Sequence, residues 1–158
     1  FPEKLIPVII QKSLLEEKLP VYGKGENVRD WLFVEDHCEA IYKVLLDGKN
    51  GETYNIGGNS EKMNIEVVKE ICKIMDEFNP RKNKSKHDEL ITFVKDRPGH
   101  DFRYAIDISK INKELNWAPK ISFKDGIRKT VQWYLENQNW VNAIHDGSYK
   151  ITRLGVTA

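Results

Sequence analysis

Apolar side chains recur at every third or fourth position in five segments of the chain. That spacing places them along one face of an α-helix, so each segment is predicted to be a helix with one buried face. Two of the five begin at residues that commonly cap helix N-termini, Asn64 and Ser122. The predicted helices cover residues 5–17, 36–46, 64–78, 107–115 and 122–135.

Three short runs rich in β-branched and aromatic residues alternate with these helices and predict strands over residues 28–34, 53–56 and 91–94. Residues 19–25 predict a short extended piece that closes in a glycine-rich turn, whereas residues 140–158 show no clear periodicity. The alternation of strands and helices is typical of the α/β class. Three short strands are too few to cover so many apolar helix faces, so we expect the chain to be the back part of a larger protein.

Composition limits the partners that the chain can have. With 158 residues and 40% hydrophobic content, it can bury the core of one ordinary domain. Its charged residues nearly balance, for a formal net charge of +1, so any anion must be recognised by a local group of cations. The lysine-rich run 81–88 is expected to be a mobile, solvated loop rather than a nucleic-acid site.

The compartment follows from three further features. No apolar run reaches the roughly 18 residues that a membrane span needs, and the first residues lack the pattern of a signal peptide. Cys38 and Cys72 have no partner spacing for zinc and are expected to be free thiols in a reducing compartment. The sequence therefore predicts a cytoplasmic protein that binds neither nucleic acid nor a membrane.

The hexapeptide Asp96–Asp101, DRPGHD, concentrates charge on one turn. Its Pro-Gly pair accounts for the turn, but turn geometry does not require the basic side chains on either side, Arg97 and His100. A guanidinium presents a planar fork of donors that suits phosphate oxygens. Arg29, within a predicted strand, would join Arg97 on a pyrophosphate if the two segments meet.

Each of these candidates also has a purely structural interpretation. Arg29 can pair with an acid, and Arg97 can pair with either aspartate of its own turn. Tyr22 can belong to ordinary packing or can offer a flat surface on which a ring stacks. Asn64 can cap its helix, although a cap amide can also reach a ligand.

Several catalytic signatures are missing from the chain. It has no G-x-G-x-x-G after a strand, no Tyr-x-x-x-Lys pair, and no cluster of His, Cys or carboxylate residues with metal-ligand spacing. The residues by themselves therefore support an anion-binding domain and no more definite function.

Longer motifs resemble a known family. The stretches VRDWLFVEDHCEAIY, GETYNIGG and DISKINKELNWAPKISFKDGIRKTVQWYLEN are similar to the extended short-chain dehydrogenase/reductases that act on nucleotide sugars. The stretches FPEKLIP, LPVYGKG and DRPGHDFRYAID resemble the dTDP-glucose 4,6-dehydratase family in particular. The resemblance runs from Phe1 to about Asn139.

The resemblance implies a two-part enzyme. Such enzymes have an N-terminal Rossmann domain that binds NAD and a smaller C-terminal domain that holds the sugar nucleotide. They oxidise C4 of dTDP-glucose, eliminate water across C5 and C6 and reduce C6, which gives dTDP-4-keto-6-deoxyglucose, a precursor of rhamnose. The base and the proton donors belong to the N-terminal half, so this chain alone is expected to be inactive, and the complete enzyme is expected to be a homodimer.

The resemblance also assigns roles along the chain. Residues 1–27 and 59–139 would form the substrate-binding domain, residues 28–58 would be a strand–helix–strand piece of the otherwise absent Rossmann sheet, and residues 140–158 would be a tail. The implied substrate-binding residues would line the nucleotide pocket, flank the base and hold the diphosphate. They are Lys4, Leu5, Ile6, Pro7, Val8, Ile9, Pro20, Val21, Tyr22, Arg29, Asn64, Asp96, Arg97, Pro98, Gly99 and His100.

Two other functions are compatible with the sequence. A UDP-hexose 4-epimerase or another nucleotide-sugar dehydratase of the same superfamily would share most motifs, and the DRPGHD turn distinguishes the dTDP-glucose group from them. A non-catalytic sugar-nucleotide-binding module would use the same residues without NAD.

Overall fold

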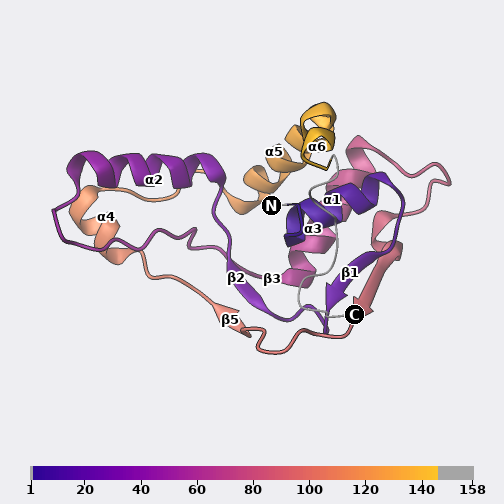
Figure 1. The fold of residues 1–158 in the computed structure, drawn as a ribbon, viewed down its shortest axis with the longest axis horizontal. Helices are drawn as coiled ribbons and strands as arrows, with labels where there is room; N and C mark the ends of the chain where they lie inside the picture. Colours follow the sequence, from indigo (N-terminus) through magenta and orange to yellow (C-terminus); the bar gives the residue numbers. More distant parts are fainter. Residues whose placement is uncertain (1, 146–158) are drawn as a thin grey trace.

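The computed structural model describes residues 2–145 of the chain. The helices are α1 (Leu5–Leu14), α2 (Val34–Asp47), α3 (Asn64–Phe78), α4 (Ser109–Leu115), α5 (Phe123–Glu136) and α6 (Gln138–His145), with a short 3-10 helix, η1 (His87–Leu90). The strands are β1 (Leu19–Tyr22), β2 (Val28–Asp30), β3 (Glu61–Met63), β4 (Ile91–Val94) and β5 (Arg103–Tyr104). Figure 1 shows two groups of elements, with β2, β3 and β5 between them.

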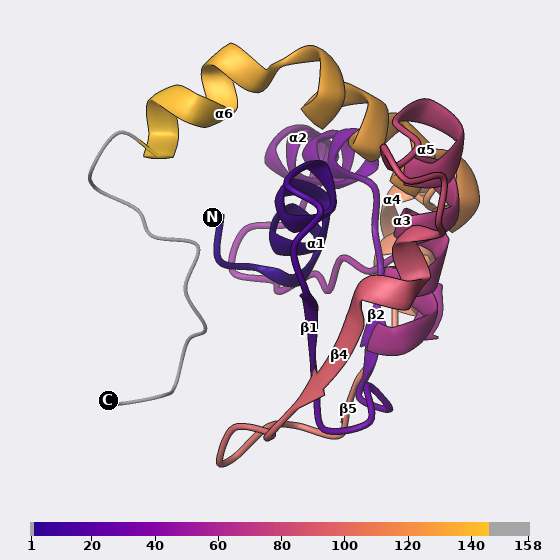
Figure 2. The ribbon, with the colours of Figure 1, turned by 90° about the vertical axis from the view of Figure 1, so that its right-hand side faces the viewer.

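The larger group is built on β1 and β4, which run parallel and pair from Leu19 with Ile91 to Tyr22 with Val94. Helix α1 packs against β1, α3 packs against α1, and α5 packs against α3, so that all share one core with the two strands. Figure 2 shows the two strands side by side next to α1 and α3. The apolar positions that predict these three helices are the ones that meet in this core. The core residues are Ile9, Ile10, Leu19, Val21, Val67, Val68, Ile71, Cys72, Ile74, Met75, Ile127 and Val131.

A second, three-stranded sheet joins the two groups. Its central strand is β2, with β3 antiparallel on one side and β5 parallel on the other. The Asp30 carboxylate of β2 accepts hydrogen bonds of 2.7 Å from the backbone N–H groups of Gly58 and Ser60. The segment around Gly58 and Ser60 returns from the smaller group. These bonds attach it to β2, the central strand of the sheet.

The smaller group has a core of its own, formed by Ala40 of α2, Ile111 and Leu115 of α4, and Trp117. Residues 53–56 run along this core, where Tyr54 and Ile56 pack against it. They pair with no strand in residues 2–145, so the strand predicted over residues 53–56 is not formed there and stays a prediction for the complete sheet. A strand needs a neighbouring strand to take up its backbone hydrogen bonds, and the elements beside this segment are helices.

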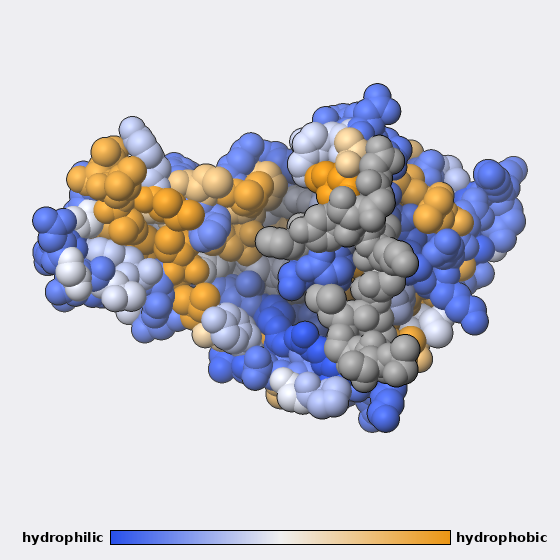
Figure 3. Space-filling view, viewed as in Figure 1, coloured by the Kyte–Doolittle hydropathy of each residue, from blue (hydrophilic) through white to orange (hydrophobic). Residues whose placement is uncertain are grey.

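One face of α2 is apolar and open to solvent. Its side chains are between 51% and 77% exposed, and Figure 3 shows the resulting orange patch over the smaller group. A contiguous apolar face of this kind is typical of a surface that another domain covers. The α2 face consists of Val34, Ile41, Tyr42, Leu45 and Leu46. None of the helices described in residues 2–145 is long and apolar enough to cross a membrane.

Three element boundaries differ from the sequence prediction for local reasons. Helix α1 ends before residue 17, because Glu16 adopts a left-handed backbone with φ of +53°. The strand predicted to reach Val34 ends with β2, and Val34 instead begins α2. Helix α4 begins at Ser109, whose backbone N–H donates to the Asp107 side chain at 2.8 Å.

The two predicted helix caps have different outcomes. Ser122 caps α5, because its hydroxyl accepts the backbone N–H of Asp125 at 3.1 Å. Asn64 does not cap α3, since it is the first residue of the helix and Met63 holds the cap position. There the Glu66 carboxylate accepts the Met63 N–H at 2.7 Å. Helix α6, for which the sequence has no clear periodicity, was not predicted.

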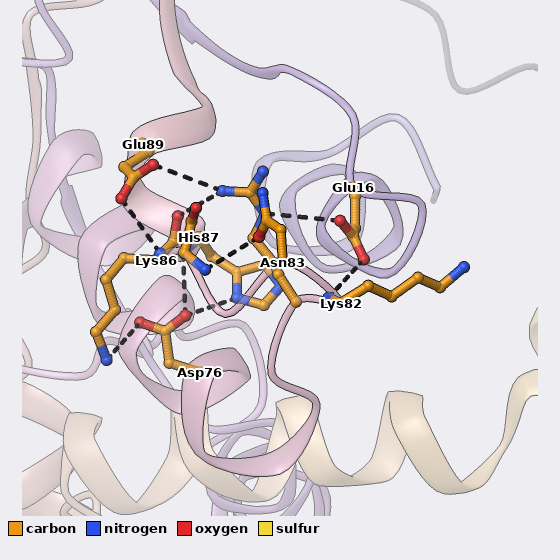
Figure 4. A network of polar contacts seen from close by, with 9 residues as sticks. Glu16, Asp76, Lys82, Asn83, Lys86, His87 and Glu89 are labelled. Carbon is orange, nitrogen blue, oxygen red and sulfur yellow. Dashed lines mark hydrogen bonds and ion pairs between the residues drawn. The ribbon is translucent and has the colours of Figure 1, made fainter.

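The polar run 81–88 is mostly exposed, as expected for a solvated loop, but polar contacts also hold it to the body of the protein (Figure 4). The His87 side chain is fully buried, and its Nδ1 lies 2.8 Å from Oδ1 of Asp76 on α3. Arg81 donates to the Lys86 carbonyl at 3.0 Å, and the Lys82 N–H donates to Glu16 at 3.1 Å. A run without apolar residues is thus anchored by polar contacts, which hydrophobic periodicity cannot detect.

Candidate functional site

A cavity of about 410 Å³ opens where the start of α1, strand β1, strand β2, the start of α3 and the turn after β4 meet. Segments that are far apart in the sequence therefore contribute to one space. The residues that line it are Glu3, Lys4, Leu5, Ile6, Pro7, Val8, Lys12, Pro20, Tyr22, Arg29, Trp31, Asn64, Arg97 and His100.

The first turn of α1 forms one wall of the cavity. Pro7 is tolerated there because the first N–H groups of a helix have no partner within the helix. Lys4 is the N-cap residue, and its carbonyl accepts the Val8 N–H at 3.0 Å. Of the predicted segment Lys4–Ile9, the first five residues line the cavity, whereas Ile9 is fully buried in the core.

Strand β1 divides its side chains between the cavity and the core. Pro20 and Tyr22 line the cavity, whereas Leu19 and Val21 are buried in the core, as the alternation of a strand requires. Val21 therefore lies behind the site and not in it. The Tyr22 ring meets the His100 ring edge-on, with centroids 6.0 Å apart and an interplanar angle of 79°.

The charged turn forms another wall of the cavity. The Asp96 carboxylate accepts the backbone N–H of Arg97 at 2.8 Å and lies 2.7 Å from Nδ1 of His100. Arg97 and His100 line the cavity, whereas Asp96, Pro98 and Gly99 do not. Burial opposes ionisation of Asp96, but the hydrogen bonds from His100 and Arg97 and the positive charge of both outweigh it and lower the pKa of that carboxyl. Asp96 thus holds the turn in shape while the two basic side chains face the cavity.

Arg29 reaches the cavity from the middle of the second sheet. Its guanidinium donates to two backbone carbonyls, that of Val28 at 2.6 Å and that of Asp101 at 2.8 Å. Within residues 2–145, neither Arg29 nor Arg97 forms an ion pair with an acid, so the ion-pair interpretation of both is wrong there. Two guanidiniums thus bring positive charge to one cavity. No carboxylate of the described chain neutralises that charge by pairing directly with either of them.

Three lining residues were missed by the sequence prediction, although two of them leave a signal. Lys12 lies two turns along α1 from Lys4, on the face that also carries Val8. Trp31 follows Arg29 by two residues, so an extended chain carries both side chains to the same side. Glu3 precedes the helix, and no periodicity points to it.

The comparisons with known proteins decide the family. A family model described as GDP-mannose 4,6 dehydratase matches residues 1–130 of the chain. The chain belongs to this family. The resemblance to the C-terminal part of dTDP-glucose 4,6-dehydratases that the sequence motifs indicate is also confirmed.

Several curated members of this family are similar over nearly the whole chain. The dTDP-glucose 4,6-dehydratase of Xanthomonas campestris pv. campestris is 58% identical over 157 residues, which are 99% of this chain and 45% of that protein. The corresponding enzyme of Neisseria meningitidis serogroup B is 55% identical, over 98% of this chain and 44% of the relative. The chain thus spans less than half the length of these relatives.

Solved structures of family members share the fold. A dTDP-glucose 4,6-dehydratase from Bacillus anthracis matches with a TM-score of 0.78 at 48% identity, over 89% of this chain and 42% of that one. The enzyme DesIV of Streptomyces venezuelae matches with a TM-score of 0.77 at 42% identity, over 88% and 40%. The fold class is therefore confirmed as α/β, that of the C-terminal part of an extended short-chain dehydrogenase/reductase.

Proposed function

We propose that this chain is the sugar-nucleotide-binding part of a dTDP-glucose 4,6-dehydratase. The observation that carries the proposal is the cavity, which gathers most of the substrate-binding positions implied by the family resemblance although they come from five separate segments. The similar enzymes are named for dTDP-glucose, and the DesIV structure is described with NAD and TYD bound.

The lining residues have the chemistry that a nucleoside diphosphate needs. Arg29 and Arg97 offer two guanidinium forks, each able to make paired hydrogen bonds to phosphate oxygens. Tyr22 and Pro20 offer flat, largely apolar surfaces on which a thymine ring can lie. Asn64, freed from capping its helix, brings an amide that can donate to the diphosphate or to a sugar hydroxyl.

The chemistry of the reaction belongs to residues outside these segments. The complete enzyme would oxidise C4 of the glucose, eliminate water across C5 and C6 and reduce C6 to give dTDP-4-keto-6-deoxyglucose. The residues of this chain do not fit NAD, because no strand is followed by the glycine fingerprint that brings a backbone close to a pyrophosphate. We assign NAD binding to the N-terminal Rossmann domain and substrate binding to this chain.

The exposed face of α2 supports the same division. It would pack against the N-terminal domain, so that residues 28–58 belong to that half of the enzyme and residues 1–27 and 59–139 to the substrate-binding half. The complete enzyme would be a cytoplasmic homodimer in the synthesis of deoxysugars such as rhamnose.

An epimerase of the same superfamily is the less favoured function. The UDP-glucose 4-epimerase of Thermotoga maritima shares the fold with a TM-score of 0.73, but at 23% identity that likeness concerns the fold alone. A non-catalytic binding module is disfavoured by the 58% identity to a named dehydratase.

The test is the reaction itself. The complete protein, incubated with NAD+ and dTDP-glucose, is expected to form dTDP-4-keto-6-deoxyglucose, detected by mass spectrometry of the product. UDP-glucose serves as the control substrate and is expected to give little product. Epimerisation of UDP-glucose, or binding of dTDP-glucose without any conversion, would show that the proposal is wrong.

A further inference from the structure

The turn that carries Arg97 and His100 is tied to the rest of the cavity at its last residue. The backbone carbonyl of Asp101 accepts two side-chain hydrogen bonds, from Nη2 of Arg29 at 2.8 Å and from Nδ2 of Asn27 at 3.2 Å. Asn27 lies immediately before β2, and Arg29 lies within it. The turn is therefore fastened to the same segment that supplies the first cavity arginine.

Asn27 also connects this segment to α3. Its own carbonyl accepts the backbone N–H of Asn64 at 2.9 Å, at the first residue of the helix. The residue is only 6% exposed, and it does not line the cavity. It therefore lies behind the site, bonded to two of the segments that bring side chains into it and next to a third.

The two donors to the Asp101 carbonyl differ in what a ligand would do to them. A diphosphate in the cavity would draw the Arg29 guanidinium toward its oxygens, because a charge-assisted bond is stronger than a bond to a neutral carbonyl. The Asn27 amide is buried away from the cavity and has no such competing acceptor. Its bond would hold the turn in place while Arg29 is engaged.

We infer that Asn27 is a positioning residue of the diphosphate site, which holds the Arg97 turn at the distance where both guanidiniums reach one ligand. The inference rests on the proposed function, because it supposes that the two arginines share a diphosphate. Asn27 itself touches no substrate, and its effect on binding acts through Arg97.

The experiment measures binding of dTDP and of thymidine, which has no phosphate, to the complete protein. Asn27→Leu keeps the approximate volume and removes the amide, and we expect it to weaken dTDP binding about tenfold while thymidine binding changes less than about twofold. Asn27→Gln keeps an amide and should restore part of the affinity. Asn112→Leu is the matched control, because Asn112 also donates to a backbone carbonyl, that of Trp117 at 3.3 Å, on α4 and away from the cavity.

A double-mutant cycle separates positioning from general destabilisation. In an Arg97→Ala background, Asn27→Leu is expected to weaken dTDP binding by less than about twofold, because the group that it positions has been removed. Equal losses for dTDP and thymidine, an undiminished loss in the Arg97→Ala background, or no loss at all would overturn the inference. Failure of the unmodified protein to bind dTDP would instead overturn the proposed function, and this inference with it.

Discussion

Arg29 and Arg97 come from segments 68 positions apart in a chain whose formal net charge is only +1, yet both side chains line one cavity. A diphosphate carries about two negative charges, and charge-assisted hydrogen bonds are worth about 1.5–3 kcal/mol each. We therefore expect that changing either arginine to alanine in the complete protein weakens dTDP binding about tenfold or more. Lysine should restore only part of the affinity, since it keeps the charge and loses the planar fork.

Calorimetric titration with dTDP and a thermal melt of each variant test this expectation together. Arg128→Ala is a suitable control, because Arg128 pairs with Glu77 on the surface, outside the cavity. If the alanine variants melt at a lower temperature but bind dTDP unchanged, the two arginines support the fold and not the ligand.

Asp76 shows how a single carboxyl couples stability to pH (Figure 4). Burial opposes its ionisation, but the hydrogen bonds from the His87 side chain and backbone and the charge of Lys86 outweigh burial, so its pKa lies below the ordinary value of 3.8. A lowered folded-state pKa gives stability that is complete above the unfolded-state pKa and is lost as the pH falls through the folded-state pKa.

We therefore expect Asp76→Asn to lower the melting temperature at neutral pH and to make it less sensitive to acid below about pH 4. The comparison is with Asp47→Asn, which removes an exposed ion pair to Lys43 on α2. Melting temperatures of the complete protein across the acid range provide the measurement. Parallel curves for the two variants and the unmodified protein would contradict the assigned role of Asp76.

At the scale of elements, periodicity predicts what is buried and misses what is held by polar contacts. The helical spacing of apolar residues locates α1, α3 and α5 because the same residues form the main core. Helix α6 covers only 8 residues, too few to show a clear apolar period in the sequence, so it was not predicted. The run 81–88 is anchored by charged groups around Arg81 and His87, and these contacts were not predicted either. Residues 53–56 have the composition of a strand, but strand formation depends on a neighbour that no local pattern reports.

The same distinction applies to the site. The family resemblance predicts continuous runs of binding residues, such as Lys4–Ile9. In a helix or strand, however, only some residues of such a run have side chains that face the cavity. Ile9 and Val21 are therefore in the core, while Trp31 and Lys12 line the cavity although the family resemblance gave neither of them a binding role. The position of a residue along its helix or strand decides whether its side chain faces the cavity or the core. That position can be read from the sequence only once the first and last residues of the element are known.

The close packing between the end of β1 and the start of α3 depends on Gly25. Its φ is +73°, and a Cβ atom there would lie 2.7 Å from Cγ1 of Val21 and 2.8 Å from Cβ of Ile65. Gly51 has a φ of +83° with nothing within 4 Å, so an alanine there adds backbone strain alone. We expect Gly51→Ala to lower the free energy of unfolding by about 1–2 kcal/mol. Gly25→Ala should cost about 1–3 kcal/mol more, because overpacking adds to the same strain.

Urea denaturation of the two variants in the complete protein measures the difference. Equal losses of stability would mean that the segment around Gly25 moves to accept a methyl group, and that the packing between β1 and α3 is not close.

At the scale of the whole molecule, the α2 face determines how this chain behaves alone. We expect the isolated 158-residue chain to self-associate at micromolar concentration, because an exposed apolar helix face favours association. Leu45→Glu, at the most exposed position of that face, should shift the chain toward monomer. Leu15→Glu, at an equally apolar but separate position on the surface, should not. Sedimentation velocity gives the distribution, and a monomeric, cooperatively unfolding chain would contradict the expectation.

The central claim is that the cavity bounded by α1, β1, β2, α3 and the 96–101 turn holds the dTDP part of the substrate. A crystal structure of the complete protein with dTDP tests it most directly. We predict that the thymine ring lies against Tyr22 and Pro20 and that the diphosphate lies within hydrogen-bond distance of both Arg29 and Arg97. A nucleotide bound outside this cavity, or a diphosphate that contacts neither guanidinium, would contradict the account.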